Sequence, residues 1–163
     1  MQGFAPGLLD KLLTGNKHTS SSDIVIRLSI EELKDSVARD LEALLNTRKV
    51  IADDLFKLYP ECSKSIFTYG LNDFAGLSLA STDDRAYICR SLEKTIARHE
   101  SRLQNVQASL EVQEGSINKL NFAISALLVV HPAQEPVSFD AVLQPSSLHY
   151  SISKTRRTAR IEI

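Results

Sequence analysis

The spacing of apolar residues changes once along this 163-residue chain, and that change limits the folds it can adopt. Up to about residue 99, apolar residues recur every three or four positions, which is typical of amphipathic helices. Beyond Arg102 they alternate with polar residues, which is typical of half-buried strands. Helices followed by consecutive strands predict an α+β fold, with N-terminal helices packed on a small antiparallel or mixed β-sheet formed by the C-terminal half.

The main predicted helix begins after Ser29, which forms an S-x-x-E capping box with Glu32. A stripe of apolar residues at helical spacing follows and includes Leu41, which is expected in the core. Residues 36–48 would place Arg48 within that stripe, so this charge needs a partner or ends the helix. The opposite side of the helix carries a polar face, formed by Arg39, Glu42 and Asn46. Whether this face contacts solvent or a partner stays open at this stage.

A second helix is predicted from Ser81 or Thr82 to about His99. Between the two helices, residues 65–76 predict an irregular, well-packed loop with a turn at Gly70. Its expected anchors are the large apolar residues Phe67, Tyr69, Leu71 and Phe74.

Four strands are predicted in the second half, at residues 106–112, 120–130, 137–143 and 149–153. The far end of the second run is apolar on both sides, which predicts a central strand covered on both faces.

Three parts are expected along the chain: a short helix and flexible linker (1–23), one α+β domain (24–153) and a basic tail (154–163). In the first part, Leu9 and Leu12 belong to a narrow apolar stripe. Such a stripe either folds back onto the domain or docks on another protein.

Composition and motifs exclude several classes of function. The formal net charge of −1 argues against a nucleic-acid-binding protein. No apolar run is long enough to cross a membrane, so the chain is not expected to be membrane-embedded. The two cysteines lie outside any C-x-x-C pattern, and the histidines are scattered, which predicts reduced thiols in a cytoplasmic protein with no metal site. No phosphate loop or dinucleotide fingerprint occurs, so no cofactor is expected.

Carboxylates are the remaining candidates for catalysis, namely Asp53, Asp54, Asp83, Asp84, Glu100 and Glu135. A glycosidase needs two carboxyls across a cleft, one of them in an apolar pocket. A peptidoglycan hydrolase is therefore an alternative function, and a self-associating domain is another. Glu100 and Arg102 flank the corner between the second helix and the first strand, where they either brace one another or face a partner.

Three segments in this order resemble the TssE family of type VI secretion baseplate subunits, which is related to the small wedge protein of contractile phage tails. The segments are SVARDLEALLNTR (36–48), YGLNDFAG (69–76) and LNFAISALLVVHPAQEPVSFDAVLQP (120–145). The resemblance covers about residues 24–153. It implies a non-enzymatic structural subunit in the cytoplasm, at a baseplate on the cytoplasmic side of the inner membrane.

The family carries a Glu-Pro-Arg corner, which Glu100 and Arg102 match, while Ser101 replaces the proline and lacks its fixed φ. The resemblance implies that this pair helps to dock the subunit on the wedge proteins TssF, TssG and TssK. Alanine at either position should then weaken docking and leave the domain folded.

The resemblance also implies contact with the first sheath ring, TssB and TssC, whose assembly the subunit would nucleate. An edge strand between residues 137 and 153 would receive a sheath strand by main-chain pairing.

Overall fold

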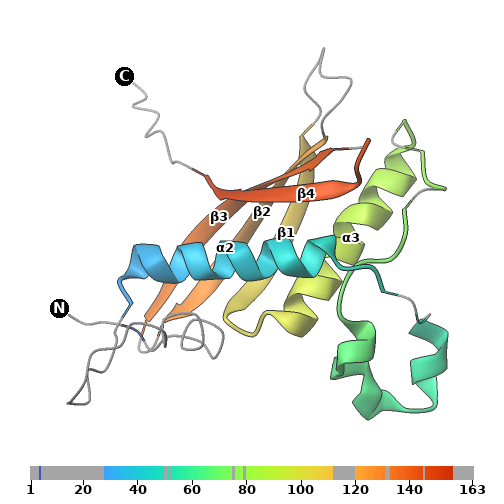
Figure 1. The fold of residues 1–163 in the computed structure, drawn as a ribbon, viewed down its shortest axis with the longest axis horizontal. Coiled ribbons are helices and arrows are strands. Elements are labelled where there is room, and N and C mark those ends of the chain that lie inside the picture. Colours follow the sequence, from blue (N-terminus) through green and yellow to red (C-terminus); the bar gives the residue numbers. More distant parts are fainter. Residues whose placement is uncertain are drawn as a thin grey trace.

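The computed structural model describes residues 4, 28–49, 51, 53–74, 76–78, 80–111, 120–130, 133–144 and 146–155. Within these residues, two α-helices and a four-stranded antiparallel sheet of order β1-β2-β3-β4 form the fold (Figure 1). The elements are α2 (Ile30–Asn46), the 3₁₀-helices η1 (Asp53–Lys57), η2 (Pro60–Lys64) and η3 (Ile66–Thr68), α3 (Thr82–His99), β1 (Leu103–Glu111), β2 (Leu120–Val130), β3 (Ala133–Gln144) and β4 (His149–Lys154). The predicted α+β class is confirmed, and the sheet is antiparallel throughout.

Both helices begin as the sequence predicts. Ser29 caps α2, with its N–H donating to Glu32 Oε2 (2.7 Å) and its Oγ accepting from the Glu32 N–H (3.2 Å). Ser81 caps α3 by accepting from the Asp84 N–H. Helix α2 ends at Asn46, so Arg48 lies beyond its last turn and does not interrupt the apolar stripe.

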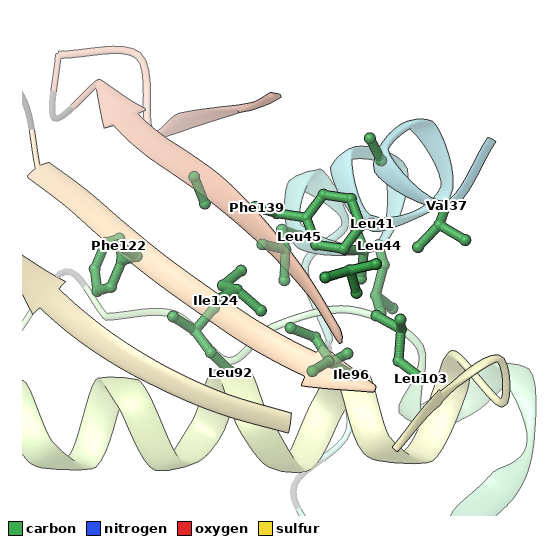
Figure 2. Close-up of a cluster of buried hydrophobic side chains, with 14 of the residues drawn as sticks. Val37, Leu41, Leu44, Leu45, Leu92, Ile96, Leu103, Phe122, Ile124 and Phe139 are labelled. Atoms are coloured by element: carbon green, nitrogen blue, oxygen red, sulfur yellow. The ribbon is translucent and has the colours of Figure 1, made fainter. Parts of the chain in front are cut away.

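The core lies between the two helices and one face of the sheet. Figure 2 shows side chains from α2 and α3 converging on those of the strands. Fully buried members from each layer include Leu41, Leu92, Ile124 and Phe139. Burial of a large apolar side chain contributes about 1.5–3 kcal/mol, so this cluster is the main source of stability.

Strand β2 lies between β1 and β3, which confirms its predicted central position. Its alternate residues face the helices and are buried. Leu127 and Val129 point to the other face and are only half-buried. The expectation that the far end of this strand is covered on both faces is therefore wrong, because the described helices pack on one face of the sheet.

The loop after the 3₁₀-helices is fixed by a short parallel bridge to the end of α2. The Leu71 N–H donates to the Thr47 carbonyl (2.9 Å), and the Lys49 N–H donates to the Leu71 carbonyl (2.8 Å). Leu71 is fully buried and Tyr69 is half-buried. Phe67, expected as an anchor, is 58% exposed, so that expectation is wrong. The expectation rested on the size and apolar character of the residue, which do not determine the direction of its side chain within η3.

The structure describes only parts of the two segments predicted to flank the domain. Leu9 and Leu12 lie outside the described residues. Phe4 is described, and it forms two backbone hydrogen bonds with Leu28 (2.8 and 2.9 Å). Lys154, expected in the basic tail, is the last residue of β4.

Gly70 has a conformation that other residues rarely adopt, which gives a direct test of the loop. Its φ is +106°, and a Cβ placed there would lie 2.4 Å from the Thr47 carbonyl oxygen. We expect Gly70→Ala to lower the free energy of unfolding by about 2–3 kcal/mol, measured by urea denaturation. Gly76→Ala is the control, because nothing lies within 4 Å of its Cβ position, and it should change stability by less than about 0.5 kcal/mol. Equal changes in stability for the two variants would show that the bridge between Thr47 and Leu71 accommodates the added methyl group.

Candidate functional site

The corner between α3 and β1 is built around the Arg102 guanidinium. Glu100 is the C-cap residue of α3, and Arg102 immediately precedes β1. Glu100 Oε1 accepts from Arg102 Nε (2.8 Å) and from the Arg102 backbone N–H (3.0 Å), while Oε2 accepts from Nη2 (2.5 Å). The guanidinium therefore binds this carboxylate with two nitrogens, the strongest arrangement for such a pair.

The same guanidinium reaches helix α2. Its Nη2 also donates to Asp40, and its Nη1 donates to Ser36 Oγ (3.4 Å). We call Ser36, Asp40, Glu100 and Arg102 the arginine clamp. It joins α2, the end of α3 and the start of β1 at one point.

The arginine clamp is partly buried. Glu100 is 6% exposed. The side chains of Arg102 and Asp40 are 26% and 37% exposed. Hydrogen bonding to Glu100 raises the pKa of Arg102 against the opposing effect of burial, so the guanidinium stays charged. The two predicted residues thus brace one another, and a rim of polar atoms from Arg102 and Asp40 remains at the surface.

The expectation that alanine at either position leaves the domain folded stays a prediction. Because Glu100 and Arg102 bind each other, either change is nonetheless expected to lower the stability of the domain. Removal of Arg102 would leave a buried Glu100 carboxylate without its counter-charge, which is strongly destabilising. A test of partner binding therefore needs a variant that spares these contacts.

Sequence reasoning missed Ser36 and Asp40. They stand four residues apart, so they share one side of α2. Ser36 is 1% exposed although it is polar. A polar pair at this spacing beside an apolar stripe was the available signal, but it did not show that its partner comes from a residue 62 positions later.

Tyr69 and His99 form an aromatic pair beside the arginine clamp. Their rings meet edge to face at 5.4 Å. Burial raises the pKa of Tyr69, and the Asp40 and Glu100 carboxylates raise it further. The YG segment and the charged corner, which are far apart in sequence, therefore belong to one site.

The position of Arg48 is also explained. Its guanidinium donates to the carbonyl oxygens of Leu45 (3.1 Å) and Leu148 (2.9 Å). The partner that the sequence requires for this charge is therefore a pair of backbone carbonyl groups. Arg48 thus joins the end of α2 to the turn before β4.

The polar face of α2 lies against the edge strand β4. Asn46 accepts from the Tyr150 N–H (2.8 Å) and donates to the Tyr150 carbonyl (2.9 Å). Glu42 accepts from the Ile152 N–H (2.9 Å). These two residues therefore occupy backbone groups that an incoming strand would otherwise use.

Helix α3 covers the opposite edge strand in the same way. Glu93 Oε1 accepts from the Ala108 N–H in β1 (2.8 Å). Burial raises the pKa of the Cys89 thiol, against a hydrogen bond from the Leu110 backbone that lowers it. Side chains of the two helices thus cap the middle of both sheet edges.

The start of β3 extends beyond the end of β4. The Thr155 N–H donates to the Ser138 carbonyl (3.0 Å), so Ser138 faces the β4 side. Because strand residues alternate, Gln134 and Pro136 face that side too, where the named strands pair only from Phe139 onward. A groove of about 460 Å³ lies beside this segment.

The carboxylates considered for catalysis occupy separate structural positions. Asp83 and Asp84 lie in the first turn of α3. Asp54 pairs with Lys57. Glu135 pairs with Lys34 of α2 (2.6 Å). Within the described part of the chain, no three metal-binding side chains group together, and no helix is long and apolar enough to span a bilayer.

A small antiparallel sheet with helices on one face and a buried Glu–Arg corner defines a structural α+β domain. Residues 31–133 match the family of the baseplate wedge protein gp25, so the chain belongs to that family, which includes TssE. This is a family of structural components of phage-tail-like baseplates. The comparison with curated proteins returned no match.

Removing the guanidinium tests the structural part of this site. We expect Arg102→Met to lower the free energy of unfolding by about 2–3 kcal/mol in urea denaturation, because Glu100 loses its counter-charge in a site that water still reaches. Lys57→Met is the control. Its pair with Asp54 is more than three-quarters exposed, and it should change stability by less than about 0.5 kcal/mol. Similar losses from both variants would contradict the clamp.

The pH dependence of the free energy of unfolding tests the burial of His99 in this site. Burial lowers the pKa of His99 below its usual value of about 6.5, although the Thr68 carbonyl opposes the shift. As pH falls from 7 through 6.5, the unfolded chain binds a proton before the folded chain does, so the free energy of unfolding falls until the folded pKa is passed. His99→Gln should remove this fall between pH 7.5 and 5.5, measured by urea denaturation. His149→Gln, at an exposed residue, should retain it, and an unchanged slope in His99→Gln would refute the assignment.

Proposed function

We propose that the chain is a non-enzymatic baseplate subunit of a type VI secretion system. It links the wedge proteins TssF, TssG and TssK to the sheath proteins TssB and TssC and nucleates sheath assembly. It works in the cytoplasm, at the baseplate on the cytoplasmic side of the inner membrane. The family match over residues 31–133, which spans the arginine clamp and β2, carries this proposal.

The exposed rim of the arginine clamp is the proposed wedge contact. Arg102 and Asp40 keep polar atoms at the surface, while Glu100 holds the guanidinium in a fixed position. A preset charged group loses little conformational entropy on binding. The clamp carries two carboxylates and one guanidinium, so a basic or amide side chain of the wedge suits it.

The start of β3 is the proposed sheath contact. The edges of β1 and β4 are capped by side chains of α3 and α2, whereas residues 133–137 continue past β4. The proposed contact therefore moves to residues 133–137, at and before the start of the edge expected from the sequence (137–153). Pro136 has no N–H to donate at that edge, which limits uncontrolled pairing and leaves carbonyl oxygens for a sheath strand.

A peptidoglycan hydrolase remains the second candidate. Its candidate carboxylates are dispersed, and Glu100 is bound to Arg102 rather than placed in an apolar pocket. That activity predicts release of soluble fragments from purified cell wall by the isolated protein. Activity that is lost on changing one carboxylate would replace the structural proposal.

The wedge contact is best tested at Ser101, which lies between the two charged residues and is exposed. We expect Ser101→Trp to place a bulky side chain at the interface and reduce co-purification with TssF and TssG by about tenfold or more. The thermal midpoint should stay unchanged, because the bonds of Glu100 and Arg102 do not involve the Ser101 side chain.

Ser109→Trp is the matched control, since Ser109 is an exposed serine on β1. It should leave co-purification at the wild-type level. Undiminished binding of Ser101→Trp would place the wedge contact elsewhere, and failure of the wild-type chain to bind any of the five named proteins would refute the proposed function.

A further inference from the structure

A groove rich in hydrogen-bond donors runs along α3. It belongs to neither the proposed wedge contact nor the proposed sheath contact. It encloses about 180 Å³. Four cationic residues line it: Lys49, Arg90, Lys94 and Arg98. No carboxylate stands among its described lining residues, which otherwise carry hydroxyl and amide groups. Such a lining favours a ligand with negatively charged oxygens.

The cations follow the geometry of the helix. Arg90, Lys94 and Arg98 stand four residues apart, so they share one side of α3 at intervals of about 6 Å along its axis. Lys49 reaches the same groove from the loop after α2. The positive charges of two of these residues also act on a partly buried group. Arg98 and Lys49 add to the effect of burial in lowering the pKa of His99.

Exposed apolar residues occur at this groove and next to one of its lining residues in the sequence. Thr68, a lining residue, ends η3, and the two residues before it, Ile66 and Phe67, are 83% and 58% exposed. Tyr87 lies at the groove itself and is also exposed. Figure 1 shows the segment η1–η3 set apart from the sheet, which agrees with the exposure of Ile66 and Phe67. Grouped exposed apolar residues next to charged ones are typical of protein contact sites.

We propose that the groove of α3 and the exposed residues of η3 together bind an acidic protein segment that also carries apolar side chains. The cations and hydroxyls suit carboxylates, and Phe67 and Tyr87 suit the apolar residues between them. Nucleic acid fits less well, because the chain has a net charge of −1 and a pI of about 6.4. The inference does not depend on the proposed wedge or sheath contacts.

The test uses the full chain and a short probe peptide in which glutamate alternates with phenylalanine and leucine. Amide chemical shifts should change along α3 between Arg90 and Arg98 and at Thr68. The paired change Arg90→Glu with Lys94→Glu should weaken binding about tenfold or more. Phe67→Ser should weaken it by a smaller factor.

Arg39→Glu is the matched control. Arg39 is exposed on α2, so this substitution reverses a charge of the same sign outside the groove. It should bind the peptide as the wild type does. If the paired variant fails to fold, Arg90→Gln alone should still weaken binding several-fold.

Three results would overturn the inference: no saturable binding, equal weakening by Arg39→Glu, or equal binding of a peptide with lysine in place of glutamate. Tighter binding of phosphatidylglycerol vesicles or of a DNA duplex would assign the surface to a different partner. The probe is not a baseplate protein, so these outcomes are separate from those of the co-purification experiment.

Discussion

The arginine clamp is the contact on which the rest of the domain depends. Helix α2 packs chiefly against β4 and α3 chiefly against β1, so the two helices meet each other only slightly. Arg102 bridges that gap by binding Glu100 at the end of α3 and Asp40 on α2. Since Glu100 is buried, neither carboxylate nor guanidinium is easily replaced. The clamp thus joins the two helices at the point where β1 begins.

The same helices determine which parts of the sheet stay available. An antiparallel sheet with two edges invites pairing with other chains. Here Asn46 and Glu42 occupy the edge of β4, and Glu93 occupies that of β1. The start of β3 continues past this protection, and Pro136 limits its hydrogen bonding. A protein that receives a strand at one defined place needs this combination of closed and open edges, which agrees with the proposed adaptor function.

Much of this fold follows from local sequence signals. The capping box at Ser29, the start of α3 at Ser81 and the alternation in β2 each act over a few residues, so the sequence predicts them well. The features that the sequence did not predict depend on contacts between residues far apart in the chain. Asp40 joins the clamp through Arg102, and Glu42 bonds a strand 110 residues later, neither of which a helical pattern can show. Phe67 was misjudged because the size and apolar character of a loop residue do not show which way its side chain points. The site was therefore predicted as a pair, whereas it is a network joining three elements.

We propose that one face of this domain meets the baseplate wedge while another meets the sheath. A cryo-electron microscopy reconstruction of baseplates purified with the tagged chain tests this most directly. We predict density for the domain between wedge and sheath, with Ser101 and Arg102 toward TssF and TssG and the start of β3 toward the first sheath ring. Density for the domain at any other place in the baseplate would contradict this arrangement.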